Sequence, residues 1–154
     1  MDALQPLRDV LLREEVLLRQ LLQAADQMRD ALINSDFALL EAASQTMREA
    51  GDELDQVENE RQSALEAAAA PSIDAALATT TAPARQDLEA LVDRLRGTAL
   101  DLRVAQERNA QLILGAARLR DRWYNLLVGM AAPTYGATGR QRAAAGRRFV
   151  SKSA

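Results

Sequence analysis

A heptad pattern in the second half of the chain constrains the fold most strongly. Thirteen positions follow strict three-four spacing, and eleven of them are apolar. They are Leu88, Leu91, Leu95, Thr98, Leu102, Ala105, Asn109, Leu112, Ala116, Leu119, Trp123, Leu126 and Met130. We call this set the heptad stripe. Such spacing places one apolar stripe along a long helix and is typical of coiled-coil packing. The pattern therefore predicts a helix over about residues 83–131 that packs lengthwise against partner helices.

The prolines predict where the helices end, because proline disrupts a helix interior. Pro6 and Pro71 enclose 64 residues, which as one helix would form a rod of roughly 96 Å, too long for a compact domain. A break is expected at residues 34–36, where Asn, Ser and Asp favour helix caps. The elements expected in the body are helices over about 3–33, 36–69 and 83–131, with a linker over 70–82 in which residues 72–77 could form one or two helical turns.

These elements predict an all-α fold, an elongated antiparallel bundle of three long helices with coiled-coil-like packing. The first helix has a wide apolar face, which suggests contact with two neighbours. The third helix is longer than its partners, so about one third of it must project, bend back or bury its stripe elsewhere. An uncovered apolar patch usually marks an interaction site.

Charge divides the chain into an acidic body and a basic end. Residues 1–132 carry 14 basic and 22 acidic side chains, a net charge of −8, whereas residues 133–154 carry five basic and no acidic side chains. We therefore expect a helical domain over 1–132 and a flexible basic tail over 133–154. An acidic body argues against nucleic acid as the main ligand, since affinity for a duplex comes chiefly from neutralising phosphates.

Composition removes much of catalytic chemistry. The chain has no Cys and no His, which excludes the Ser-His-Asp and Cys-His nucleophiles, thiol redox pairs and the usual zinc sites. Acidic side chains on one helix surface are best interpreted as a solvated face, so no catalytic residue, metal site or cofactor is expected. The start of the chain lacks the layout of a secretory signal, and no apolar run is long enough for membrane insertion. A cytoplasmic binding protein is the simplest expectation.

Two regions are candidate binding sites. The first is the end of the third helix, with Leu112 of the heptad stripe and the group Leu119, Trp123, Leu126, Leu127 and Met130. These side chains could equally be core. The second is the tail segment with Tyr135, Gly136 and Gly139, which is either a turn or a short recognition motif. Asn109 lies at a seam position, where a polar side chain can set register at a cost in stability.

The C-terminal third resembles the flagellar type III export chaperones of the FlgN type. The resemblance rests on residues 108–113 (Arg-Asn-Ala-Gln-Leu-Ile), on residues 133–139 (Pro-Thr-Tyr-Gly-Ala-Thr-Gly) and on the basic end with Arg147-Arg148-Phe149-Val150. The Ala-rich stretch 67–70 and the Thr-rich linker match nothing in that family's pattern.

The resemblance implies a cytoplasmic, non-enzymatic chaperone. Its partners would be the hook-filament junction proteins, held unassembled through their amphipathic terminal helices, and the flagellar export gate. The cargo-binding residues would be Leu112, Leu119, Trp123, Leu126 and Met130, and Tyr135 in its Gly136–Gly139 motif would dock on the gate. Two other hypotheses remain open at this point: a structural coiled-coil adaptor acting by homo-oligomerisation, and a basic-tailed nucleic-acid binder.

Overall fold

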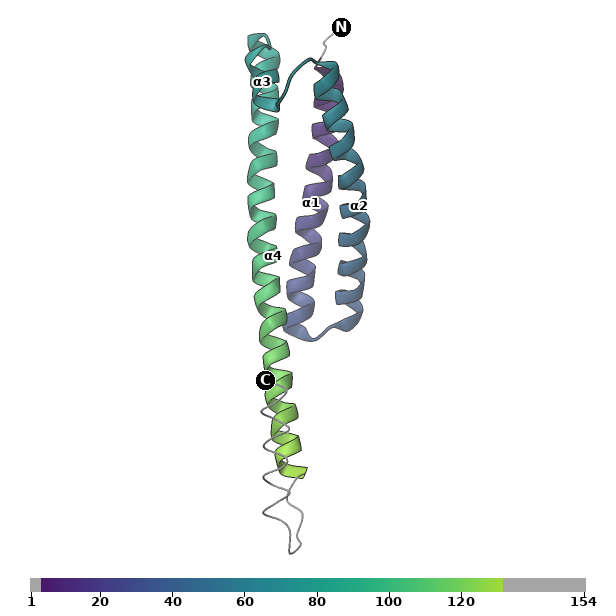
Figure 1. The fold of residues 1–154 in the computed structure, drawn as a ribbon, viewed down its shortest axis with the longest axis vertical. Coiled ribbons are helices and arrows are strands. Elements are labelled where there is room, and N and C mark those ends of the chain that lie inside the picture. The colour runs from purple at the N-terminus through teal and green to yellow at the C-terminus, as the bar shows by residue number, and fades with distance from the viewer. Residues whose placement is uncertain (1–3, 132–154) are drawn as a thin grey trace, which may run out of the picture. The chain divides into compact units, whose positions relative to one another are not determined.

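The computed structural model describes residues 4–131, and these form helices without any strand (Figure 1). The elements are α1 (Gln5–Asn34), α2 (Phe37–Ala67), α3 (Ile73–Ala78) and α4 (Ala82–Ala131). The prediction of an all-α fold of packed helices is confirmed. The prediction of three helices is wrong, because α3 is a fourth helix inside the segment expected to be a linker.

Two compact units make up the chain, Met1–Ala110 and Gln111–Ala154. The first unit holds α1, α2, α3 and the part of α4 up to Ala110. The described part of the second unit is the remainder of α4, residues 111–131. The basic tail predicted over 133–154, with Tyr135, Gly136 and Gly139, lies outside the described residues.

Local capping explains the turn between α1 and α2. Ser35 takes a left-handed conformation, with φ of 54°, after the last residue of α1. Asp36 then caps α2, since its carboxylate accepts a hydrogen bond of 3.0 Å from the Leu39 amide. Three short polar residues therefore end one helix and start the next.

Burial and capping also explain α3. The Ser72 hydroxyl accepts a hydrogen bond of 3.1 Å from the Ala75 amide, and Ala76 and Leu77 are buried in the core. Asp74 pairs with Arg96 of α4 at 3.1 Å. Contacts within the first unit thus stabilise a helix of six residues, which is too short to be stable alone.

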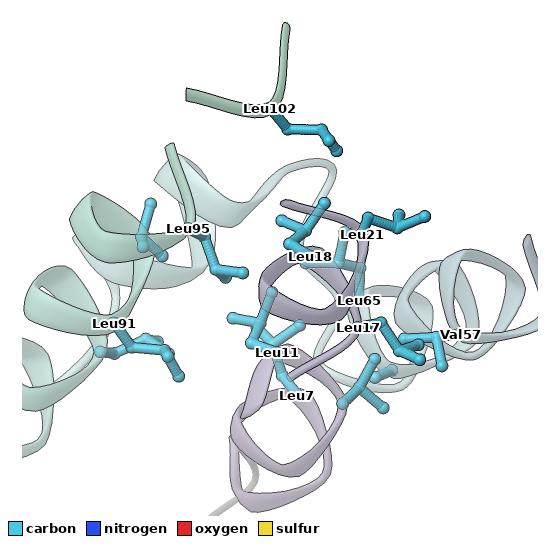
Figure 2. Close-up of a cluster of buried hydrophobic side chains, with 14 of the residues drawn as sticks. Leu7, Leu11, Leu17, Leu18, Leu21, Val57, Leu65, Leu91, Leu95 and Leu102 are labelled. Atoms are coloured by element: carbon cyan, nitrogen blue, oxygen red, sulfur yellow. The ribbon is translucent and has the colours of Figure 1, made fainter. Parts of the chain in front are cut away.

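In the first unit, α1 packs against both α2 and α4. Arg61 of α2 pairs with Glu14 at 2.6 Å, and Arg94 of α4 pairs with Glu15 at 2.8 Å. The wide apolar face of α1 is therefore covered on two sides. Figure 2 shows its leucines between Leu91 and Leu95 of α4 and Val57 of α2.

The contacts between these helices also fix their directions. The paired residues 13 and 60, and 14 and 61, lie at similar distances along the chain from the turn at residues 35–36, so α2 returns antiparallel to α1 and brings the chain back for α3. Along α4 the order is the same as along α1, since Glu15 meets Arg94 and Asp26 meets Arg108. Consequently α1 and α4 run parallel, with α2 antiparallel to both. Coiled-coil-like packing of these helices remains a prediction.

Among the described residues of the first unit, Glu15 is the most deeply buried charged group, with 6% of the residue exposed. Its Oε1 accepts hydrogen bonds from Arg94 at 2.8 Å and from Arg19 at 2.7 Å. The hydrogen bond from Arg94 is the main cause that lowers the pKa of the carboxyl group; burial acts in the opposite direction, and the charges of Arg19 and Arg94 lower it further. Glu15 therefore stabilises the fold above its unfolded-state pKa, and this contribution is lost as pH falls through the lower folded-state pKa.

We predict that Arg94→Ala lowers the free energy of unfolding at neutral pH, because a buried carboxylate then keeps a single, largely exposed partner, Arg19. The deficit relative to the parent should shrink as pH falls below the unfolded-state pKa of Glu15 and through its lower folded-state pKa, because protonation removes the charge that Arg94 stabilises. Urea unfolding at several pH values measures this difference in the free energy of unfolding. Arg103→Ala, which removes an exposed pair with Glu107, is the matched control and should change stability little. An Arg94→Ala deficit that does not vary with pH would contradict this role of Glu15.

Candidate binding surface

The heptad stripe changes from buried to exposed along α4. Its members in the first unit are buried, apart from the half-buried Thr98, and the last of them is Asn109 at 3% exposed. In the second unit Leu112 is half-buried, and the four large side chains that follow are exposed: Leu119 55%, Trp123 57%, Leu126 52% and Met130 66%. The same sequence pattern thus gives core in one unit and apolar surface in the other.

Asn109 marks the end of the buried stretch. Its Nδ2 donates a hydrogen bond of 2.7 Å to the Ala25 carbonyl of α1, and its Oδ1 accepts none from the described residues. The neighbouring Arg108 pairs with Asp26 at 3.0 Å. A buried amide that bonds a specific carbonyl favours one register of α4 on α1, as the seam position predicted.

The candidate cargo-binding residues all lie on one face of α4. At about 100° per residue, Leu112, Ala116, Leu119, Trp123, Leu126 and Met130 fall within an arc of roughly 80°. We call these six residues of the heptad stripe the primary face. Its exposed side chains include the single Trp of the chain. Apolar side chains on a continuous strip of this kind fit the apolar face of an amphipathic helix.

A second set of apolar side chains lies beside the primary face; Leu127 was among the candidates named from the sequence, but the set was not recognised there. Ile113, Tyr124 and Leu127 are 49%, 63% and 60% exposed. With Ala117 and Arg120 they follow three-four spacing one position after the heptad stripe. We call Ile113, Ala117, Arg120, Tyr124 and Leu127 the second face. The three-four spacing of the second face can be read from the sequence, but the heptad stripe beside it is longer and more regular.

The described part of the second unit is also basic. Residues 111–131 contain Arg118, Arg120 and Arg122 against the single acidic Asp121. Arg120 lies 3.3 Å from Asp121, with 78% and 67% of the two side chains exposed, so this ion pair contributes little. The described part of the second unit therefore carries exposed apolar side chains on two adjoining faces, with Arg120 within the second face, and a net positive charge.

The described residues offer no comparable site for chemistry. They contain no group of three or more His, Cys, Asp or Glu side chains that could hold a metal ion. A hollow of about 320 Å³ lies between the beginnings of α1 and α4, lined by residues such as Arg8, Thr80 and Asp87, and it gathers no nucleophile with a base. None of the four helices is both long and apolar enough to cross a membrane.

Comparison with known proteins gives the family. The model of the FlgN protein family matches residues 1–143, which include every described helix. No curated protein and no solved structure matches the chain. The match confirms the resemblance drawn from residues 108–113 and 133–139. FlgN proteins are chaperones rather than enzymes, and they act in flagellum biogenesis and type III export. The chain therefore belongs to the FlgN family of flagellar export chaperones.

Proposed function

We propose that this chaperone binds the amphipathic terminal helices of hook-filament junction proteins in the cytoplasm, prevents their premature assembly and delivers them to the flagellar export gate. The exposed end of the heptad stripe supports the proposal. Leu119, Trp123, Leu126 and Met130 continue the spacing of the buried core, yet half or more of each residue is exposed. A helix laid on them would bury the same kind of surface that the first unit buries internally.

The size of this surface also suits reversible binding. Burying four such side chains contributes about 2 kcal/mol each, whereas association costs at least about 4 kcal/mol. The remaining free energy, about 4 kcal/mol, corresponds to a Kd of about 1 mM. A chaperone that must hold and then release its cargo needs contacts beyond the four large side chains of the primary face, but not many more.

Delivery would use a separate site. We assign docking on the export gate to Tyr135, Gly136 and Gly139, which lie outside the described residues. The assignment rests on the tail motif and on the family match, which extends to residue 143. Separate sites let the chaperone keep its cargo while it reaches the gate.

A coiled-coil adaptor that acts by homo-oligomerisation is the alternative. It would cover the primary face with a second copy of the same helix and would need no cargo. Molar mass in solution separates the two functions: the chaperone should be a monomer that forms a one-to-one complex with a junction protein. A stable dimer without affinity for a junction protein's terminal helix would favour the adaptor.

We predict that Trp123→Ala combined with Leu126→Ala weakens binding to a junction protein by at least about 100-fold, since two large apolar anchors are lost. Both side chains are more than half exposed, so the free energy of unfolding should change little. Isothermal titration with a purified junction protein measures the affinity, and circular dichroism measures the helix content.

The matched control is Leu91→Ala combined with Leu95→Ala, at buried positions of the same stripe. It should destabilise the first unit by several kcal/mol, because each truncation leaves a cavity. If the Trp123 and Leu126 variant lost helix content to the same degree, these side chains would be core and the assignment of the primary face would be wrong.

A further prediction concerns the tail. Tyr135→Ala should leave the affinity for a junction protein unchanged within about twofold, because cargo and gate use different residues. Export of the junction protein should fall, which quantification of the exported junction protein measures. Tyr135→Phe, which keeps the aromatic ring, is the conservative control. Loss of cargo affinity together with export would show that the tail and the primary face form one site.

A further inference from the structure

The apolar surface of the second unit is wider than one helix can cover. Residues 112–130 of α4 advance by about 100° each, so the primary and second faces together span roughly 180° of the helix circumference. A helix that packs against one partner needs a stripe of about 100°. Asn125 and Arg118 lie on the opposite side, which is mainly polar although it also carries Leu114, 50% of which is exposed. The second unit therefore presents two helix-binding faces, side by side.

The chain contains an internal example of such a surface. The buried residues of α1 fall on two adjoining stripes of similar spacing, one with Leu7, Leu11, Leu18 and Ala25 and the other with Val10, Leu17, Ala24 and Ala31. Two different helices, α2 and α4, cover them, as the separate ion pairs of Glu14 and Glu15 show. In this chain, two adjoining apolar stripes on one helix, α1, are thus covered by two separate helices.

We propose that the segment 111–131 binds two amphipathic helices of one junction protein together, one on the primary face and one on the second face. The inference rests on the proposed function and specifies its partner. The four large side chains of the primary face support only weak binding by themselves, and the exposed Ile113, Tyr124 and Leu127 would add further apolar contacts. The bound segment would become the central helix of a three-helix arrangement, as α1 is in the first unit.

The charge of the second face indicates the kind of helix that it would bind. Arg120 lies within the second face, and its described ion pair is the exposed one with the adjacent Asp121. A cargo helix with an acidic side chain opposite Arg120 would satisfy the guanidinium group. A second copy of this segment would instead bring arginines together, and the basic tail of the chain carries no acid at all. The fitting occupant is therefore an acidic helix of another protein.

The two faces can be tested separately, because the chain has no Cys. Ala116 of the primary face and Ala117 of the second face are adjacent, so Ala116→Cys and Ala117→Cys form a matched pair, with Asn125→Cys as the control on the polar side. The rate of maleimide modification is measured on the full chain, alone, with a full-length junction protein, and with a peptide of that protein's single C-terminal helix.

We expect the full-length junction protein to slow modification at both 116 and 117 by at least about tenfold and to leave 125 unaffected, since bound helices exclude the reagent. The single-helix peptide should protect one of the two positions. Equal protection of both by the peptide, or protection of one alone by the whole protein, would overturn the inference. So would a complex that contains two copies of this chain. Protection of neither would overturn the proposed function as well.

A charge reversal gives an independent readout. Arg120→Glu should weaken binding of the full-length junction protein by about tenfold, because it places like charges opposite each other on the second face. It should leave the affinity of a peptide that occupies the primary face unchanged. Arg118→Glu, the same charge change on the polar side, should alter neither affinity by more than about twofold. Equal effects of the two reversals on the full-length protein would mean that the second face is not occupied.

Discussion

Burial of α1 on two sides is the contact on which the first unit depends. Leu7 and Leu11 of this helix are fully buried, and the core cluster joins them to residues from α2, α3 and α4. Hydrophobic burial has little directional preference. The register and orientation of the neighbouring helices on α1 therefore depend on specific polar pairs.

Two consecutive acidic side chains on α1 form such polar pairs. Glu14 and Glu15 lie about 100° apart around the helix, and each pairs with an arginine of a different neighbour, Arg61 of α2 and Arg94 of α4. Both carboxylates are largely removed from water, with 13% and 8% of their side chains exposed. Losing either partner would leave a poorly solvated charge. Glu14 and Glu15 thus favour α2 on one side of α1 and α4 on the other, although the apolar residues on the two sides are similar.

Sequence reasoning recovered the elements that carry a local signal. The heptad stripe indicated α4, and the short polar residues 34–36 indicated the break between α1 and α2. The segment that forms α3 was expected to be a linker with one or two possible helical turns, because six residues have too little periodicity to predict a separate helix and their stability comes from the burial of Ala76 and Leu77. Successive long helices alternate in direction, so α1 and α4 run the same way with α2 antiparallel to both.

The limits of sequence reasoning are clearest within the heptad stripe. Leu91 and Leu119 occupy equivalent positions in the repeat, yet 2% of one and 55% of the other is exposed. Periodicity reports which face of a helix is apolar, not what covers it. The difference comes from contacts made by α1, a helix that lies some 80 residues earlier in the chain.

The continuity of α4 from Ala82 to Ala131 has a consequence for the entropy of recognition. A peptide of about 20 residues is marginally helical in water, because the first turn fixes several dihedral angles for one hydrogen bond. Residues 111–131 need no such nucleation, since the turns before them are already ordered by the first unit. A free recognition peptide would lose conformational entropy by forming a helix each time it bound a partner. In this chain part of that entropy is already lost when the first unit folds.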